Sequence, residues 1–182
     1  MLVGELRRSF VSGVSAKARM LSEIVRRVLY NKDAMSEGVF IMKKLNLSVV
    51  SFSYPRGIPD DPDDDYWGGF VFDCRSLPDP HGIAALKNFS GLDKPVVDFF
   101  EQHKAQIDRF LDAAEALVRQ SIDAFLVDGR DYLQVAFGCH GGHHRSVYMA
   151  ERFAERLAGT PGIEVEVKHT ARQHWCERNM TH

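Results

Sequence analysis

An apolar run that leads through a glycine-rich turn into an amphipathic helix limits the folds open to this chain more than any other feature. The run covers Tyr132 to Phe137, the turn covers Gly138 to Gly142, and the helix begins at His144 or Arg145. Glycines let the backbone bend so that successive N–H groups point inward, and a helix start adds roughly half a positive charge. With Arg145 as a bidentate donor, this unit predicts an anion site suited to phosphate.

Similar strand and helix patterns cover the chain from Leu45 onward. The sequence predicts strands over 47–53, 69–74, 132–137 and 163–167, with one or two helices reaching about Leu126 and a helix ending at Leu157. Asp93 is placed to cap the first helix, and Asp128-Gly129 to end the helical stretch. This order predicts an α/β fold with a mainly parallel, twisted sheet of about four or more strands flanked by helices. Ligands of such sheets bind beyond the carboxyl ends of the strands, where the loop at Cys139 falls.

The pattern divides the chain into a single domain, residues 45–170, with an N-terminal extension over 1–44 and a tail over 171–182. Apolar residues between Met20 and Leu29 recur at helical spacing with basic residues between them, so the extension is predicted to be helical. That helix either packs on its own domain or a partner, or meets RNA or a membrane surface. Met42 also reads like a chain start, so residues 1–41 are either an upstream extension or part of the fold.

The amino-acid composition limits the kinds of function that this chain can have. The net charge of −2 gives no general attraction to nucleic acid, so any such binding needs a local patch. Three cysteines without a CxxC pair indicate a reduced, cytoplasmic protein, and no apolar run is long enough to cross a bilayer. We therefore expect no membrane partner and no cofactor. Five aspartates between Asp60 and Asp65 form either a metal site or, as their spacing favours, a solvated acidic loop.

The glycine-rich turn also matches the phosphate loop of cysteine-dependent phosphatases, C-x5-R-S, from Cys139 to Ser146. Cys139 would be the nucleophile, Arg145 would hold the phosphate oxygens, and Ser146 would assist the leaving thiolate. Gly138 stands where these enzymes usually carry histidine. No aspartic general acid is evident, and the run from Asp60 to Asp65 is a candidate only by default.

A metal site is the second interpretation of the turn. His140, His143 and His144 lie close in sequence, and Cys139 and His169 would complete a shell. The His140–His144 spacing suits zinc only on a helix, which the intervening Gly141-Gly142 opposes. Histidines that line an anion site explain the pattern better, so no metal is expected.

Four ordered segments resemble the C-terminal domain of the RapZ/YvcJ family, over about residues 46–170. They are Ser51-Phe-Ser-Tyr-x-x-Gly-Ile-Pro, Phe70-Val-Phe-Asp-Cys-Arg-Ser-Leu-Pro-Asp-Pro-His81, Ser90-Gly-Leu-Asp-Lys-Pro-Val and Gly138-Cys-His-Gly-Gly-His-His-Arg-Ser-Val-Tyr-Met-Ala-Glu-Arg. The family's P-loop domain has no counterpart, because no G-x-x-x-x-G-K-[ST] occurs. The resemblance implies a regulatory module similar to the sugar-phosphate-binding half of an RNase adapter, which senses glucosamine-6-phosphate and binds small RNAs.

Carried onto matching positions, the resemblance implies ligand contacts from His81, Gly141, His144 and Arg145, with His140 where the family usually has threonine. The full set of candidate ligand residues is His81, His140, Gly141, Gly142, His143, His144, Arg145, Ser146 and, from its place after a strand end, Arg75. Arg75 is equally suited to an ion pair with the acidic loop. The larger His140 leaves the preferred sugar open.

The expected partners are a small phosphorylated metabolite and, through the resemblance, RNA or a protein. Lys168, Arg172 and Arg178, with Trp175, are the candidate RNA-binding residues, although a solvated tail explains them equally well. Family adapters assemble through several interfaces, which makes a homodimer an expectation that no residue pattern demonstrates. Cysteine phosphatase activity remains the alternative function.

Overall fold

The protein's computed structural model describes residues 44–60 and 69–175, all within one unit, Lys43–His182. Its strands and longer helices are β1 (Leu45–Ser53), β2 (Phe70–Asp73), α2 (Lys94–Gln102), α3 (Lys104–Asp128), β3 (Tyr132–Cys139), α4 (Arg145–Leu157) and β4 (Ile163–His169). Short 3-10 turns cover Tyr54–Arg56, Cys74–Ser76, Pro80–Gly82 and Arg172–His174. The predicted helix near Met20–Leu29, most of the acidic loop and Arg178 lie outside the described residues.

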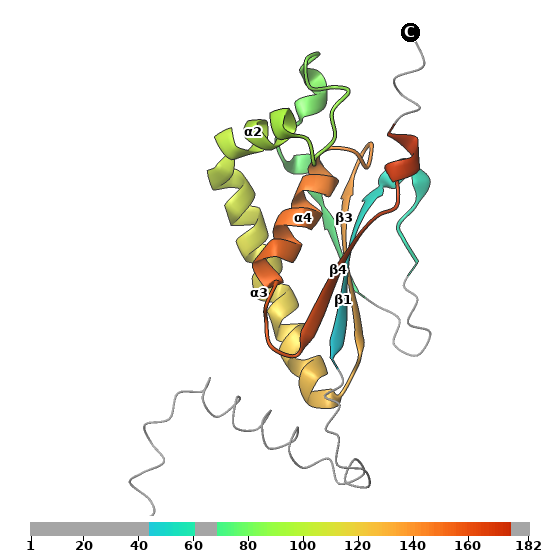
Figure 1. Ribbon diagram of the computed structural model, residues 1–182, viewed down its shortest axis with the longest axis vertical. Coiled ribbons are helices and arrows are strands. Elements are labelled where there is room, and N and C mark those ends of the chain that lie inside the picture. The colour runs from blue at the N-terminus through green and yellow to red at the C-terminus, as the bar shows by residue number, and fades with distance from the viewer. Residues whose placement is uncertain (1–43, 61–68, 176–182) are drawn as a thin grey trace, which may run out of the picture. The chain divides into compact units, whose positions relative to one another are not determined.

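The four strands form one parallel sheet in the order β2-β3-β1-β4, which confirms the predicted α/β class (Figure 1). Val49 in the middle of β1 pairs with Val135 of β3 and Val167 of β4. β1 and β3 occupy the centre, and both read as nearly continuous buried runs, as central parallel strands do. Because all four strands run the same way, Ser53, Asp73 and Cys139 end at one edge of the sheet.

The three described helices lie on one face of the sheet, and α4 packs directly on β1, β3 and β4 (Figure 1). Phe137 of β3 meets Phe153 of α4 with ring centroids 5.2 Å apart, and Phe100 of α2 stacks on Tyr148 of α4 at 4.5 Å. On the other face a small cluster of Val50, Phe52 and Ala136 is packed by Tyr54. None of the helices within the described ranges has the length and apolar character needed to cross a membrane.

The helix boundaries match the predicted signals with one difference. Asp93 does occupy the N-cap of α2, but its carboxylate accepts hydrogen bonds from the Ser90 N–H and Oγ at 2.6 and 2.8 Å instead of capping the helix. The Asp93 carboxylate, which was expected to bind N–H groups in the first turn of α2, therefore binds Ser90. At the other end, α3 stops at Asp128 before the left-handed Gly129, as predicted.

Candidate functional site

The loop between β3 and α4 is held by its carbonyl groups. Ser53 Oγ donates to the carbonyl of His140 at 2.8 Å, and Trp175 Nε1 donates to the carbonyl of Gly142 at 3.0 Å. In a trans peptide the carbonyl and the next N–H point in opposite directions. The N–H groups that follow these two carbonyls therefore face away from the structural donors. Gly142 adopts a φ of 61°, which makes glycine the suitable residue at this bend.

A second segment, residues 79–91, packs against the same loop. The Gly91 N–H donates to the carbonyl of His143 at 2.8 Å. At the other end of the segment, Asp79 accepts from the His81 N–H at 3.0 Å, and the His81 ring lies 6.1 Å from the His144 ring. Two stretches that are distant in sequence thus meet beyond the carboxyl end of β3.

Between them lies a cavity of about 60 Å³, lined by Asp79, His81, Cys139, His140, Gly141, His143, His144 and Arg145. The structure thus brings six of the candidate ligand residues together, namely His81, His140, Gly141, His143, His144 and Arg145. A cavity of this size has room for roughly two water molecules. It therefore accommodates a small anionic group, and the rest of a larger ligand would need side chains to move or would extend outward.

Arg145 is the first residue of α4 and its side chain is only 9% exposed. Its Nη2 lies 2.8 Å from Asp79 Oδ2, and its Nη1 donates to the carbonyl of Arg75 at 3.0 Å. The remaining nitrogen, Nε, is buried and has no hydrogen-bond partner. The guanidinium is thus fixed in the cavity wall, and one of its N–H donors is unused. It lies at the positive end of α4, whose first turn has no side-chain cap.

The ion pair with Asp79 was not predicted from the sequence. Asp79 belongs to the Asp-Pro-His81 segment that was matched to the family, but only the histidine was singled out as a ligand. The carboxylate found at the cavity is therefore Asp79, whereas Asp60, the described member of the acidic run, does not line it. A carboxylate beside a candidate phosphate arginine could only be recognised once the two segments were seen together.

His144 precedes α4 and is buried, and its Nε2 is a second polar atom without a partner in the described structure. Burial lowers the pKa of His144, since desolvation disfavours the imidazolium. A neutral ring at neutral pH keeps one nitrogen as a hydrogen-bond acceptor and the other as a donor. The cavity therefore presents one permanent cation and one adaptable polar ring.

Three candidate ligand residues do not line the cavity. Ser146 is fully buried, and its Oγ lies 3.1 Å from Cys139 Sγ. Gly142 turns its carbonyl to Trp175. The Arg75 guanidinium pairs with Asp73 at 2.6 Å, so only its backbone carbonyl reaches the site.

The Arg75 pair differs from the predicted one with the acidic loop, because Asp73 is only two residues away. Asp73 also accepts from the Arg75 N–H at 2.9 Å, and so it caps the turn after its strand. The hydrogen bond from the Arg75 side chain lowers the pKa of Asp73. Cys74, between them, is a fully buried core thiol.

The metal interpretation does not fit His169. Its Nδ1 lies 2.7 Å from Ser51 Oγ, and its Nε2 lies 3.0 Å from Glu151 Oε1, so both ring nitrogens are engaged away from the cavity. Among residues 44–60 and 69–175 no group of three or more potential ligand side chains is arranged to hold a metal ion.

The candidate RNA-binding residues have structural contacts of their own. Lys168 pairs with Glu166 at 2.5 Å, and Arg172 lies 5.9 Å from the centre of the Trp175 ring. That ring also lies 5.4 Å from the His143 ring, so Trp175 supports the loop after β3. RNA binding through Lys168, Arg172 and Arg178 remains a prediction.

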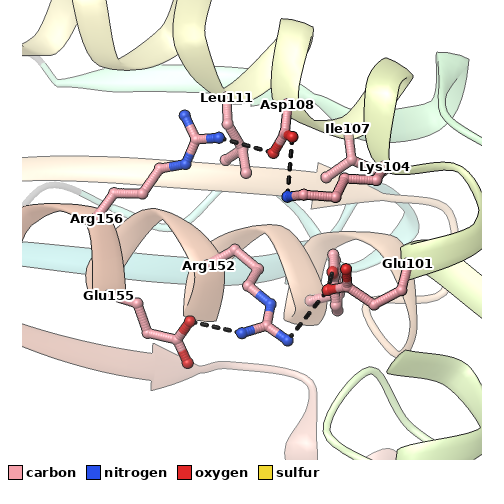
Figure 2. Close-up of a pocket in the computed structure, with 9 residues that line it drawn as sticks. Glu101, Lys104, Ile107, Asp108, Leu111, Arg152, Glu155 and Arg156 are labelled. Carbon is pink, nitrogen blue, oxygen red and sulfur yellow. Dashed lines mark hydrogen bonds and ion pairs between the residues drawn. The ribbon is translucent and has the colours of Figure 1, made fainter. Parts of the chain in front are cut away.

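A larger cavity, of about 270 Å³, lies between α4 and the helices α2 and α3 (Figure 2). Its charged side chains are paired with one another. Arg156 lies 2.9 Å from Asp108, and Arg152 lies 2.7 Å from Glu155 (Figure 2). Arg156 thus joins α4 to α3, and Arg152 pairs within α4. Since these cations already have anionic partners, the smaller cavity is the better candidate site.

Comparisons with known proteins identify the family of this chain. A nucleotide-binding protein of Alcanivorax borkumensis is 32% identical over 92% of this chain and 61% of its own length. Similar proteins with the same description occur in Paraburkholderia xenovorans, at 38% over 82% and 45%, and in Frankia casuarinae, at 43% over 69% and 41%. The chain therefore spans between 41% and 61% of the length of these relatives. The family model described as the RapZ C-terminal domain matches residues 45–173, and the chain belongs to that family.

Proposed function

We propose that this domain is a regulatory module that binds a small phosphorylated metabolite at the amino end of α4. The observation that carries the proposal is the Arg145 side chain, which is buried in the cavity wall with its Nε unpartnered. An unsatisfied buried donor on a cation costs free energy, and an anionic ligand would recover it. The unpartnered His144 Nε2 beside it supports the same site.

The ligand class follows from the groups around the cavity. Arg145 and the first-turn amides of α4 suit a phosphate group, while His81 and His144 suit sugar hydroxyls or further phosphate oxygens. Relatives described as nucleotide-binding proteins support a phosphate-bearing ligand. An amino-sugar phosphate such as glucosamine-6-phosphate is the specific ligand that we propose, with RNA or a protein partner receiving the signal.

The proposal is tested by ligand-dependent thermal stabilisation of the full chain with glucosamine-6-phosphate, other sugar phosphates and nucleotides. In Arg145→Lys the charge remains but the planar fork and Nε are lost. Charge-assisted hydrogen bonds contribute about 1.5–3 kcal/mol, so affinity is expected to fall roughly 10- to 100-fold. Arg119→Lys is the matched control, because Arg119 pairs with Glu115 on α3 and lies outside the cavity lining. Equal binding by wild type and Arg145→Lys would contradict the site, and no binding of any phosphate ligand would contradict the function.

A cysteine phosphatase is the alternative, favoured by one observation. Cys139 lines the cavity with Arg145, and its Sγ lies 3.1 Å from Ser146 Oγ, as the C-x5-R-S pattern requires. Gly138 argues against it, because a Cβ there would lie 2.6 Å from the Tyr54 ring, which leaves no room for the usual histidine.

The two functions predict different behaviour of Cys139→Ser. A binding module keeps its ligand-dependent stabilisation in this variant and hydrolyses no aryl phosphate in either form. A phosphatase hydrolyses the aryl phosphate as wild type and loses the activity in Cys139→Ser.

A further inference from the structure

Asp79 is the one carboxylate among the residues that line the described cavity, and it is already bound to the residue that would hold a phosphate. Its Oδ2 lies 2.8 Å from Arg145 Nη2, while its Oδ1 accepts from the His81 N–H. The Asp79 side chain is 43% exposed and the Arg145 side chain 9%. The carboxylate is thus the more solvent-accessible partner of this ion pair, and the guanidinium is the buried one.

This arrangement has two consequences for a ligand. A carboxylate and a phosphate compete for the same guanidinium, and two anions held close together repel each other. A ligand that brings only a phosphate must therefore either displace Asp79 from Nη2 or bind at Nε close to its negative charge, and both weaken binding. A ligand that carries a cationic group as well as a phosphate avoids this cost, because the phosphate binds Arg145 and the cation binds Asp79.

We propose that Asp79 sets the ligand selectivity of this site, by opposing ligands that carry only an anion and favouring ligands that carry both an anion and an ammonium group. This inference rests on the proposed phosphate site and assigns a role to a residue that the sequence did not single out. Asp79 acts in it as a negative charge beside the position of the ligand's phosphate.

The substitution that tests the role is Asp79→Asn. An asparagine side chain keeps an oxygen that can accept from the His81 N–H, so the local turn is preserved while the charge is removed. Asp73→Asn is a closely matched control. Asp73 likewise accepts from an N–H two residues ahead, pairs with an arginine at 2.6 Å and is 45% exposed, but it does not line the cavity.

The experiment measures affinities of the full chain for inorganic phosphate, glucose-6-phosphate and glucosamine-6-phosphate by calorimetry. The two sugar phosphates differ only in a hydroxyl or ammonium group. In Asp79→Asn, affinity for inorganic phosphate and glucose-6-phosphate is expected to rise at least threefold. The preference for glucosamine-6-phosphate over glucose-6-phosphate is expected to fall at least fivefold, while Asp73→Asn keeps both wild-type values. Unliganded unfolding midpoints of all three proteins establish that the variants fold.

If folded Asp79→Asn keeps the wild-type preference, or binds inorganic phosphate no better, the selectivity role is overturned while the phosphate site stands. If neither wild type nor Asp79→Asn binds any of the three ligands, the proposed function fails and the inference fails with it. If Asp79→Asn does not fold, Asp79→Ser is measured in its place, since serine also forms the local turn without the charge. Binding of inorganic phosphate by Asp79→Asn but not by wild type would support the competition directly.

Discussion

Two adjacent residues, His144 and Arg145, each keep a buried polar atom without a partner in the described structure. Such atoms are uncommon in folded proteins, because an unsatisfied buried group costs about 1–3 kcal/mol. Both atoms belong to residues that line the same cavity. At the scale of single residues, these two unsatisfied atoms therefore lie where a ligand would relieve them.

His144 gives this site a pH dependence. Burial lowers its pKa below the ordinary value of 6.5, so the unfolded chain binds the proton more readily than the folded one. The contribution of the neutral ring to stability is complete above pH 6.5 and is lost as the pH falls through the folded pKa. We expect His144→Gln to reduce the loss of the unfolding midpoint between pH 7.5 and pH 5.5, relative to wild type. An equal loss in both proteins would show that His144 takes up its proton with the same pKa in the folded and unfolded states.

The elements around the site differ in how well the sequence predicts them. The loop after β3 was predicted because its glycines, Arg145 and the apolar strand are contiguous. Cys139 was expected in the turn but forms the last residue of β3, since it pairs in register with Ser53 of β1. Apolar periodicity sets where a strand begins, whereas its end depends on how far the neighbouring strand continues.

Residues 79–91 were not predicted as half of the site. This segment contains short turns and little periodicity, so its position against the β3–α4 loop depends on contacts between distant residues. Both the ion pair of Asp79 and the Trp175 hydrogen bond to Gly142 are of this kind. Family resemblance identified His81 as a ligand candidate without the geometry that joins it to the cavity.

A substitution of Gly91 tests whether residues 79–91 must pack closely against the start of α4. A Cβ at Gly91 would clash with the carbonyl oxygen of His144 and lie 2.7 Å from the Tyr148 nitrogen and 2.9 Å from the Val147 Cβ. Two of these neighbours are backbone atoms at the start of α4, which cannot move without shifting the loop. We expect Gly91→Ala to destabilise the domain by about 1–3 kcal/mol and to weaken phosphate binding.

The matched control is Gly82→Ala in the same segment, since a Cβ there would meet nothing within 4 Å. Urea unfolding of both variants measures the difference, and the Gly82 variant is expected to stay within about 0.5 kcal/mol of wild type. Equal stability of the two variants would mean that residues 79–91 do not hold the loop after β3.

At the scale of the molecule, the described structure and the family match agree that the unit Lys43–His182 contains one folded domain. The family model covers residues 45–173, and the described core residues extend from Leu45 to Ala171. The first strand, β1, lies between β3 and β4 in the sheet, so the unit needs its N-terminal strand at the centre. We therefore propose that the ligand-binding domain is complete from about Met42 onward.

A variant that begins at Met42 tests this proposal. It retains β1, every described core residue and both segments that line the cavity. We expect one cooperative unfolding transition with a midpoint within about 3 °C of the full chain, the size of shift that roughly 1 kcal/mol produces in a domain of this length. Its response to glucosamine-6-phosphate should match that of the full chain, because no described residue of the cavity has been removed. Broad unfolding, or loss of the ligand response in a variant that still folds, would instead make residues 1–41 part of the folded domain or of its ligand site.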